Sequence, residues 1–286
     1  MANLELHSKM YVLDGLVVPK FIKQETLDEL KGLTLRSDDV WIVSYPKAGT
    51  TWTQYIVHLI HNGGEDDRKK ISDAVPWIES GNRGTTVTAS DLTPPRAFKS
   101  HMPYDRMPCG LPNSTPCKYI YIARNPKDLA TSFYHHYCAY HVSGMEWKEF
   151  LEYFLVGKVE FGDYFDHILS WWTHRNDDNV LFVKFEDMKR EPLAAIKRIA
   201  TFLGYINLPQ EVLTTIAEKT SFDKMRDNDT VNYSWRAYRD PKAQPFMRRG
   251  AIGDWKNQFS TEDSQRLDKL YLDHLHGTGH EFYFGQ

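Results

Sequence analysis

The feature that most constrains the fold is the alternation of four short apolar runs with helical patterns. The runs are residues 40–44, 96–100, 118–123 and 180–185. Apolar runs of this length are typical of strands buried inside a parallel sheet. Strands that alternate with helices predict an α/β fold, in which a central, mainly parallel sheet is flanked by helices and ligands gather at the carboxyl ends of the strands.

The segments that follow these runs carry helix signals. After the first run, apolar residues recur at helical spacing from Trp52 to Ile60, and a glycine pair at 63–64 ends the pattern. After the third run, Asn125-Pro126 is a typical helix start. After the fourth run, Pro192 begins a helix that extends to about residue 202.

The length of 286 residues is compatible with one large α/β domain, so we expect a single domain over residues 1–286. Two long stretches, residues 61–95 and 223–253, are rich in Gly, Pro, Asn and Asp and lack a clear pattern. Long irregular loops inside a domain are often lids or binding loops. We therefore expect these two stretches to cover a substrate or a cofactor.

Charge and cysteine content exclude several classes of protein. The net charge of −3 and the isoelectric point near 6.5 argue against a protein that coats nucleic acid, so any anion site should be local. Cys109, Cys117 and Cys138 lack paired spacing, which is typical of reduced thiols. Residues 1–7 do not resemble a secretory signal, and no window has the roughly 18 apolar residues needed to span a bilayer. These features predict a cytoplasmic protein without a membrane partner.

The first candidate site is the turn YPKAGTTW at 45–52, between the first run and its helix. Backbone N–H groups and the helix dipole at such a turn favour an anion, and Lys47 adds a positive charge. A Walker A loop would read GxxxxGK[ST], whereas here Gly49 follows the lysine and the upstream glycine is missing. The alternative is an ordinary capped helix with a solvated lysine.

A histidine and a lysine follow the second run. His101, close to Lys99, is placed at the carboxyl end of a strand, where an imidazole with a pKa near 6.5 is suited to general-base catalysis. The chain has 12 histidines, so a structural role for this one is the alternative.

Two further stretches carry cations. Arg124 ends the third run and Ser132 lies two helical turns later, so a guanidinium and a hydroxyl could hold a second phosphate. The alternative is a pair between Arg124 and Asp128. In the late loop, adjacent arginines at 248–249 precede a glycine that would let the backbone approach a phosphate, although adjacent arginines can also form a solvated patch.

The sequence contains no cluster with the spacing of a structural zinc site. His135 and His136 are adjacent, so both rings cannot face one metal ion from the same side of a helix.

Five sequence blocks, in this order, resemble those of the cytosolic sulfotransferase family. They are YPKAGTTW at 45–52, KSHMP at 99–103, RNPKD at 124–128, FEDM at 185–188, and RRG at 248–250 followed by GDWK at 253–256. The resemblance implies an enzyme that needs no metal and transfers a sulfuryl group from 3′-phosphoadenosine 5′-phosphosulfate to a hydroxyl or amine of a small acceptor.

The resemblance also implies roles for individual residues. Lys47 would contact the phosphosulfate, His101 would be the general base, and Lys99 would assist it. The residues implied in cofactor binding are Lys47, Ala48, Gly49, Thr50, Thr51, Trp52, Arg124, Ser132, Phe185, Thr220, Ser221, Phe222, Arg248, Arg249 and Gly250. Those expected to contact the acceptor are Trp77, Lys99, His101, Tyr137 and Tyr140. Their aromatic character favours a phenolic or otherwise aromatic or apolar acceptor.

Some positions depart from the family pattern. Phe185 stands where a tyrosine is usual, Arg249 where lysine is frequent, and Ala48 where serine is common. The family's C-terminal dimer motif is degenerate here, which leaves a monomer or a homodimer open.

A kinase-like phosphoryl-transfer enzyme and a nucleotide-binding homologue with impaired catalysis are the alternative functions. The kinase-like alternative is disfavoured by the order of the loop and by the lack of an evident acidic pair for Mg²⁺.

Overall fold

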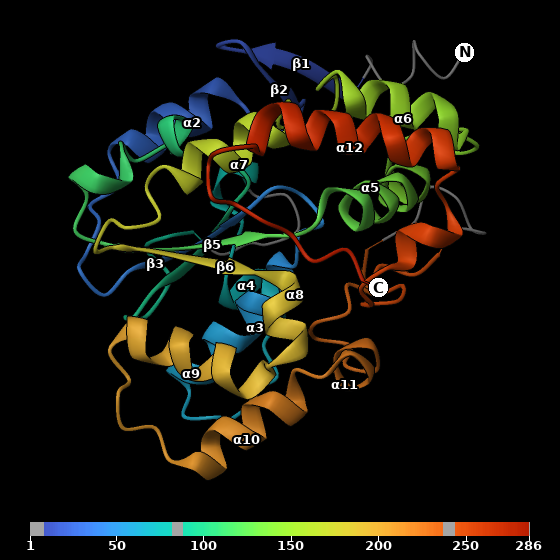
Figure 1. The fold of residues 1–286 in the computed structure, drawn as a ribbon. Helices are drawn as coiled ribbons and strands as arrows, with labels where there is room; N and C mark the ends of the chain where they lie inside the picture. The colour runs from blue at the N-terminus through green and yellow to red at the C-terminus, as the bar shows by residue number, and fades with distance from the viewer. Residues whose placement is uncertain (1–8, 82–87, 237–243, 286) are drawn as a thin grey trace.

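Four parallel strands form the central sheet, in the order β4-β3-β5-β6 (Figure 1). The computed structural model describes residues 9–81, 88–236 and 244–285. The strands are β3 (Val40–Ser44), β4 (Ala97–Ser100), β5 (Lys118–Ala123) and β6 (Val180–Lys184). All four predicted strands are confirmed, each to within one residue at its ends.

Both faces of the sheet are buried, which explains why the strands are mostly apolar, with polar residues near their ends. Successive side chains of a strand point to opposite faces. In β3, Trp41 and Val43 therefore belong to one core, and Val40 and Ile42 belong to the other. The sheet thus separates two hydrophobic cores, as expected for a parallel sheet covered on both sides.

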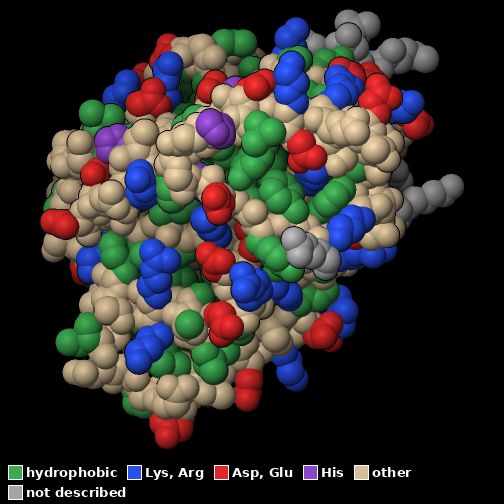
Figure 2. All heavy atoms as spheres, viewed as in Figure 1, with side chains coloured by type: hydrophobic (Ala, Val, Ile, Leu, Met, Phe, Trp, Pro, Cys, Tyr) green, Lys and Arg blue, Asp and Glu red, His purple; other side chains and the backbone are tan. Residues whose placement is uncertain are grey.

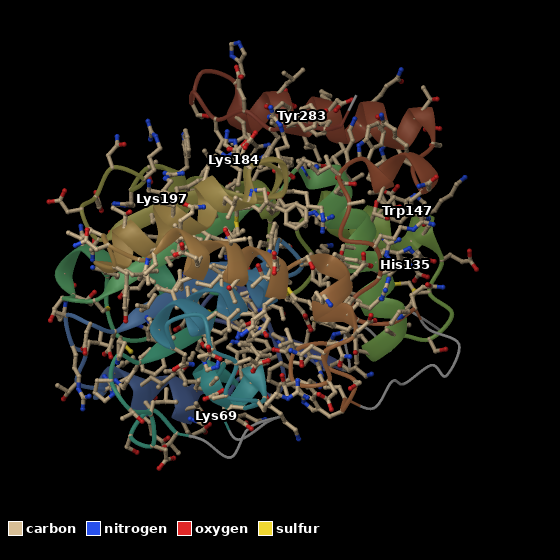
Figure 3. The ribbon with its side chains drawn as sticks, turned by 90° about the horizontal axis from the view of Figure 1, so that it is seen from below. Lys69, His135, Trp147, Lys184, Lys197 and Tyr283 are labelled. Carbon is tan, nitrogen blue, oxygen red and sulfur yellow. The ribbon has the colours of Figure 1, made fainter. Side chains whose placement is uncertain are left out.

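Helices cover each face in a separate layer (Figure 1). One layer consists of α3 (Thr50–His61), α4 (Ile71–Ala74), α8 (Phe185–Arg190), α9 (Pro192–Leu203) and α10 (Gln210–Lys219). The other consists of α5 (Pro126–Tyr140), α6 (Trp147–Leu155), α7 (Tyr164–Trp172) and α12 (Thr261–Leu275). Figure 3 shows the molecule from below, with Lys197 of α9 on one side and Trp147 of α6 on the other.

The three predicted helices are confirmed as α3, α5 and α9. The start of α5 has the expected chemistry, because the Asn125 side chain accepts a hydrogen bond from the Asp128 backbone N–H at 2.8 Å. Pro126 and Pro192 occupy first-turn positions, where the missing N–H costs nothing. Gly204 ends α9 with a φ of 99°, a left-handed conformation that favours glycine.

The remaining elements are short. They are the antiparallel hairpin β1 (Met10–Leu13) and β2 (Leu16–Pro19), the helices α2 (Gln24–Lys31) and α11 (Phe222–Arg226), and the 3₁₀ turns η1 (Ile78–Ser80), η2 (Tyr104–Arg106), η3 (Pro112–Ser114) and η4 (Asp254–Asn257). Of these, η1 lies within the first stretch expected to be an irregular lid, and all but the first residue of α11 lies within the second. Residues 82–87 and 237–243 of those lids lie outside the described residues.

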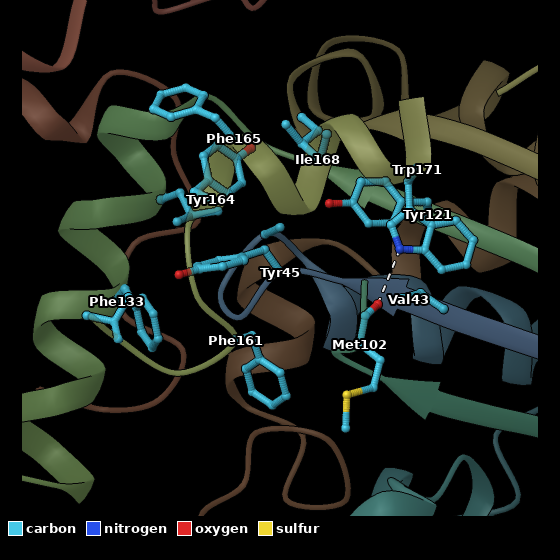
Figure 4. Packing of buried hydrophobic residues seen from close by; sticks show 14 of the residues in the cluster. Val43, Tyr45, Met102, Tyr121, Phe133, Phe161, Tyr164, Phe165, Ile168 and Trp171 are labelled. Carbon is cyan, nitrogen blue, oxygen red and sulfur yellow. Dashed lines mark hydrogen bonds between the residues drawn. The ribbon is translucent and has the colours of Figure 1, made fainter. Parts of the chain in front are cut away.

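Packing in the core with α7 holds the ends of two strands in place (Figure 4). The indole N–H of Trp171 donates to the Met102 carbonyl at 3.2 Å, directly after β4. Tyr45, directly after β3, donates its hydroxyl to the Gly162 carbonyl at 2.8 Å. Both side chains are fully buried, so the loops that leave these strands are anchored to the second layer.

Candidate active site

A cavity of about 320 Å³ lies at the carboxyl ends of the parallel strands. The segment after each strand contributes to its lining, for example Lys47 after β3, His101 after β4, Arg124 after β5 and Phe185 after β6. The cavity therefore lies where an open α/β sheet binds its ligands, on both sides of the central strand β3.

The structure brings most of the predicted site residues together in this one cavity. Its lining includes Lys47, Gly49, Thr50, Thr51, Trp52, Trp77, Lys99, His101, Arg124, Ser132, Phe185, Thr220, Ser221, Phe222, Arg248, Arg249 and Gly250. Residues from five separate sequence blocks and both predicted lids thus meet at one place.

Three predicted residues do not line the cavity. Tyr137 is fully buried in the core, where its hydroxyl accepts a hydrogen bond from the Glu160 N–H at 3.1 Å. The prediction that this ring contacts the acceptor is not supported, because helical spacing places it toward the core. Tyr140 is partly exposed and packs against a lining residue, with its ring 4.8 Å from the His136 ring. Ala48 is buried under the turn and has no exposed surface toward the cavity.

The turn after β3 has a strained geometry that points toward the cavity. Lys47 has a φ of 71° and Gly49 has a φ of 123°, the latter accessible essentially only to glycine. The Ser44 and Thr50 hydroxyls lie 2.6 Å apart and close the turn beneath. The turn leads directly into α3, so the backbone N–H groups of the first helical turn lack partners inside the helix and favour an anion.

The ammonium group of Lys47 is enclosed by the walls of the cavity. It lies over the Phe246 ring at 3.9 Å, and no carboxylate within the described part of the chain forms an ion pair with it. Burial lowers its pKa from 10.5 to about 7, helped by the positive charges of Lys99, Arg236, Arg124 and Arg248. A bound anion would reverse this, so the turn is suited to a ligand with several negative charges.

His101 is held in one orientation and one tautomer. Its Nδ1 lies 2.7 Å from the Ser44 carbonyl, and because a carbonyl can only accept, Nδ1 carries the proton. The lone pair is then on Nε2. Burial and the charge of Lys99 keep the pKa of His101 well below 6.5, so the ring is neutral at pH 7 and can accept a proton.

A second histidine, which sequence reasoning missed, supports the first. His167 on α7 donates from Nε2 to the His101 carbonyl at 2.9 Å, and its Nδ1 lies 2.9 Å from the Tyr121 hydroxyl. Both hydrogen bonds are buried, so they position the backbone of His101. No local sequence signal marks His167, because its role depends on α7 packing against the end of β4.

Lys99 lies beside His101, and both positive and negative side chains influence its charge. Its ammonium group is 4.5 Å from the Trp77 ring centroid. Burial and the charge of Arg236 lower its pKa from 10.5 to about 7, while Glu79 and Glu160 oppose the shift. Glu79 is itself buried and accepts a hydrogen bond from the Ser100 hydroxyl, and burial raises its pKa to about 7.

At the other end of the cavity, Arg124 is positioned by backbone groups. Its guanidinium donates to the carbonyls of Lys47 at 3.3 Å and Ala251 at 3.1 Å, and it lies 4.3 Å from the Phe185 ring. Its Nε is buried and has no hydrogen-bond partner within the described residues. The alternative pair with Asp128 does not form.

Asp128 instead anchors the late loop. Its carboxylate accepts from the backbone N–H of Gly253 at 2.8 Å and of Trp255 at 2.9 Å. Asp254 in the same turn pairs with Arg248 and lies 3.3 Å from the Arg249 guanidinium. Arg248 is therefore held against the cavity, whereas the side chain of Arg249 is 57% exposed and keeps much of its contact with solvent.

Aromatic rings form a wall near the Arg124 end of the cavity. Trp52 meets Phe185 edge-on at 5.5 Å, and Gly250, with a φ of 59°, packs against the Phe222 ring. Thr220 and Ser221 lie beside Phe222 in the lining. Flat faces next to hydroxyl groups are suited to a nucleobase.

Sequence reasoning also missed several residues that line the cavity on the side of His101. They are Phe21, His136, His141, Glu160, Phe161, Arg236 and Phe246. The Phe161 and Trp77 rings lie 5.4 Å and 5.0 Å from the His101 ring, so the proposed base has an aromatic enclosure. Glu160 lies next to His141, with 3.5 Å between Oε1 and Nδ1.

Cations line the cavity, among them Lys47, Lys99, Arg124, Arg236 and Arg248. On the face shown in Figure 2, Lys and Arg side chains are interspersed with acidic ones.

The described residues contain one group spaced for a metal ion, Asp163, Asp166 and His274, and none of its members lines the cavity. None of the described helices is long and apolar enough to cross a membrane.

Comparison with known proteins agrees with this geometry. A model of the sulfotransferase domain matches residues 37–279. Sulfotransferase 1B1 of Mus musculus is 39% identical over 255 residues, which cover 85% of each chain. Sulfotransferase 1A1 of Mus musculus is 36% identical over 289 residues, which cover 98% of each chain.

Solved structures extend the similarity to the whole fold. Mouse sulfotransferase SULT7A1 complexed with PAP has a TM-score of 0.75 at 30% identity and covers 94% of each chain. Retinol dehydratase in a complex with retinol and PAP has a TM-score of 0.82 at 26% identity, over 97% of this chain and 94% of the other. The chain belongs to the sulfotransferase family and is a sulfotransferase.

Proposed function

We propose that the protein transfers a sulfuryl group from 3′-phosphoadenosine 5′-phosphosulfate to a hydroxyl or amine of a small acceptor, with His101 as the general base. The observation that carries the proposal is the hydrogen bond from His101 Nδ1 to the Ser44 carbonyl, at the end of the strand that leads to Lys47. It leaves Nε2 with a lone pair in the cavity that also holds the Lys47 turn. The end of β3 thus contacts the proposed base and also leads into the proposed anion-binding turn.

The residues present fit the charge of such a donor. Arg124 has a buried Nε without a partner in the described chain, and Lys47 is a cation without an ion pair there. We assign the 3′-phosphate to Arg124, Ser132, Arg248, Arg249 and the backbone of Gly250. The remaining cofactor residues, which surround the adenine and close the turn, are those named from the family resemblance.

The chemistry follows from these positions. His101 takes the proton of the acceptor hydroxyl, which makes the oxygen a better nucleophile. Lys47 neutralises the negative charge that develops on the leaving phosphate oxygen, and the N–H groups of the turn assist it. The arginines at the far end contact a part of the donor that does not react, so their binding energy positions the sulfur between the two oxygens.

We expect the acceptor to be phenolic or otherwise aromatic or apolar, because Trp77 and Phe161 enclose the His101 ring. The proposal needs no metal ion and no nucleic-acid partner. A cytoplasmic setting is supported by the three free cysteines, Cys109, Cys117 and Cys138.

The donor part of this proposal is tested by ligand-dependent stability. Because a ligand stabilises the state that it binds, PAP (3′-phosphoadenosine 5′-phosphate) should raise the Tm several degrees more than ATP with Mg²⁺ at the same concentration. Lys47→Met and Arg248→Gln should reduce the shift with PAP, and Arg266→Gln, an exposed arginine on α12, should leave it unchanged. A larger shift with ATP and Mg²⁺ would instead support a phosphoryl-transfer enzyme.

A further inference from the structure

Arg236 is a cation of the cavity lining that has no acidic partner. Its side chain is half-buried, and within the described residues no carboxylate or carbonyl lies within ion-pair or hydrogen-bond distance of its guanidinium. The other arginines of the lining differ, since Arg248 and Arg249 share Asp254 and Arg124 donates to two carbonyls. The positive charge of Arg236 is therefore not neutralised by an ion pair within the described residues.

Aromatic rings hold the Arg236 guanidinium in place. It lies 4.5 Å from the Tyr140 ring and 6.0 Å from the Tyr233 ring. Such stacking orients the plane of the guanidinium and leaves its N–H groups free to donate. Tyr233 in turn packs at 4.6 Å on Phe246, the ring that carries the Lys47 ammonium. Two packed rings, Tyr233 and Phe246, thus lie between Arg236 and Lys47.

Arg236 lies in the part of the cavity next to Tyr140, away from Arg124. Its charge lowers the pKa of Lys99, the neighbour of His101, and also that of Lys47. It is not among the charges that act on the pKa of Arg124, at the end assigned to the 3′-phosphate. His136 lies on the same side, 4.8 Å from Tyr140, and its buried Nδ1 has no partner among the described residues.

We propose that Arg236 binds a carboxylate of the acceptor, so that the preferred acceptor is an aromatic hydroxy compound that also carries a carboxylate. A guanidinium and a carboxylate can form two parallel charge-assisted hydrogen bonds. Among the arginines of the described lining, Arg236 is the one without a carbonyl or carboxylate partner. Glu160, the acidic residue of the same region, lies next to His141 instead. The inference rests on the proposed function, since it identifies the acceptor class of the same site.

Two acceptors that differ only in charge provide the test. With saturating 3′-phosphoadenosine 5′-phosphosulfate, kcat/KM is measured for 3-(4-hydroxyphenyl)propanoate and for its amide. The wild-type protein should prefer the carboxylate by about 10-fold or more, as expected for a charged hydrogen bond. Arg236→Gln should lower kcat/KM for the carboxylate by about 10- to 100-fold, mainly through KM, and change the value for the amide by less than about threefold.

Conservative and remote variants serve as controls. Arg236→Lys keeps the charge but not the planar fork, so it should retain an intermediate preference. Arg266→Gln removes an exposed arginine that pairs with Glu152 and should leave both acceptors unaffected. An equal loss on both acceptors together with a weaker affinity for PAP would place Arg236 on the donor side and overturn the inference.

The inference and the proposed function fail in different ways. A wild-type protein that sulfates both phenols equally well would overturn the acceptor class and leave sulfuryl transfer intact. No transfer to either phenol, with no stabilisation by PAP, would contradict the proposed function and the inference with it. PAP stabilisation with transfer only to acceptors that lack a carboxylate would overturn the inference alone.

Discussion

At the scale of single residues, two buried hydrogen bonds set the tautomer of His101 and the position of its backbone. The Ser44 carbonyl assigns the proton of His101 to Nδ1, and the His167 ring holds the His101 carbonyl. Neither partner touches the cavity with its own reactive atoms. The proposed base is therefore set up by the backbone of β3 and by α7 before any ligand binds.

The low pKa values of the two lysines predict a pH-dependent affinity for PAP. The pKa values of Lys47 and Lys99 are about 7, lowered from 10.5, and a bound anion favours the charged forms of both side chains. Affinity should therefore be highest below pH 7 and fall as the pH rises from 7 to 9, by up to about tenfold per pH unit for each lysine. The phosphates of PAP lose their second proton near pH 6, so they hardly contribute in this range.

Calorimetric titrations with PAP at pH 7, 8 and 9 measure this linkage. In buffers of different ionisation enthalpy, the protein should take up protons on binding at pH 8. Lys47→Met should reduce the proton uptake and also the fall in PAP affinity between pH 7 and 9. An affinity that stays constant from pH 7 to 9 would show that neither lysine changes its charge when PAP binds.

The residues that could be predicted from the sequence share one property. His101 and Arg124 follow a strand directly and Lys47 lies in the turn after another, and parallel strands bring their carboxyl ends to one edge. Arg236 and Glu160 come from irregular segments without such a signal, so only the three-dimensional packing places them in the cavity. Tyr137 shows the opposite error, since this aromatic residue is close to the site in sequence but is buried in the core.

At the scale of elements, the turn between β3 and α3 depends on glycine. Gly49 has a φ of 123°, and a Cβ at this position would lie 3.0 Å from the Phe185 ring, a wall of the cavity. Gly49→Ala should therefore lower the free energy of unfolding by about 1–3 kcal/mol and weaken PAP binding at least about tenfold. Gly277 follows α12 with a φ of 78°, and a Cβ added there would meet no atom within 4 Å.

Gly277→Ala is thus a matched control for backbone strain alone. It should lower stability by about 1 kcal/mol and leave the affinity for PAP unchanged. Denaturant unfolding and PAP titration of both variants separate the two effects. If Gly49→Ala bound PAP as tightly as Gly277→Ala does, the turn would not be the anion-binding element.

Elements were predictable where the chain carries a strong local signal. The four strands are continuous apolar runs, and α3, α5 and α9 have clear starts or ends. The hairpin β1–β2 was missed although its Asp14-Gly15 turn, with φ values of 47° and 83°, is a favoured two-residue connection. Its strands have only four residues each, too short for the alternation of side chains to stand out.

At the scale of the whole molecule, the order of the strands places the residues proposed to bind the cofactor and the acceptor around one cavity. β3 is central, with β4 and its His101 on one side and β5 and its Arg124 on the other. This order could not be derived from the sequence, since strand pairing depends on contacts between distant segments. The late loop that carries Arg248 and Arg249 is tied to α5 through Asp128, and this connection also depends on long-range contacts.

The central claim is that this cavity transfers a sulfuryl group with His101 as the base. The most direct measurement follows radiolabelled sulfuryl from 3′-phosphoadenosine 5′-phosphosulfate to a panel of phenols, catecholamines, steroids and aliphatic alcohols. We predict labelled product and PAP in equal amounts for at least one aromatic hydroxyl acceptor. His101→Ala should slow this transfer about 100-fold or more and keep the affinity for PAP within about twofold, whereas His276→Ala, an exposed histidine after α12, should change neither. Absence of labelled product from every acceptor, or transfer by His101→Ala at the wild-type rate, would contradict the account.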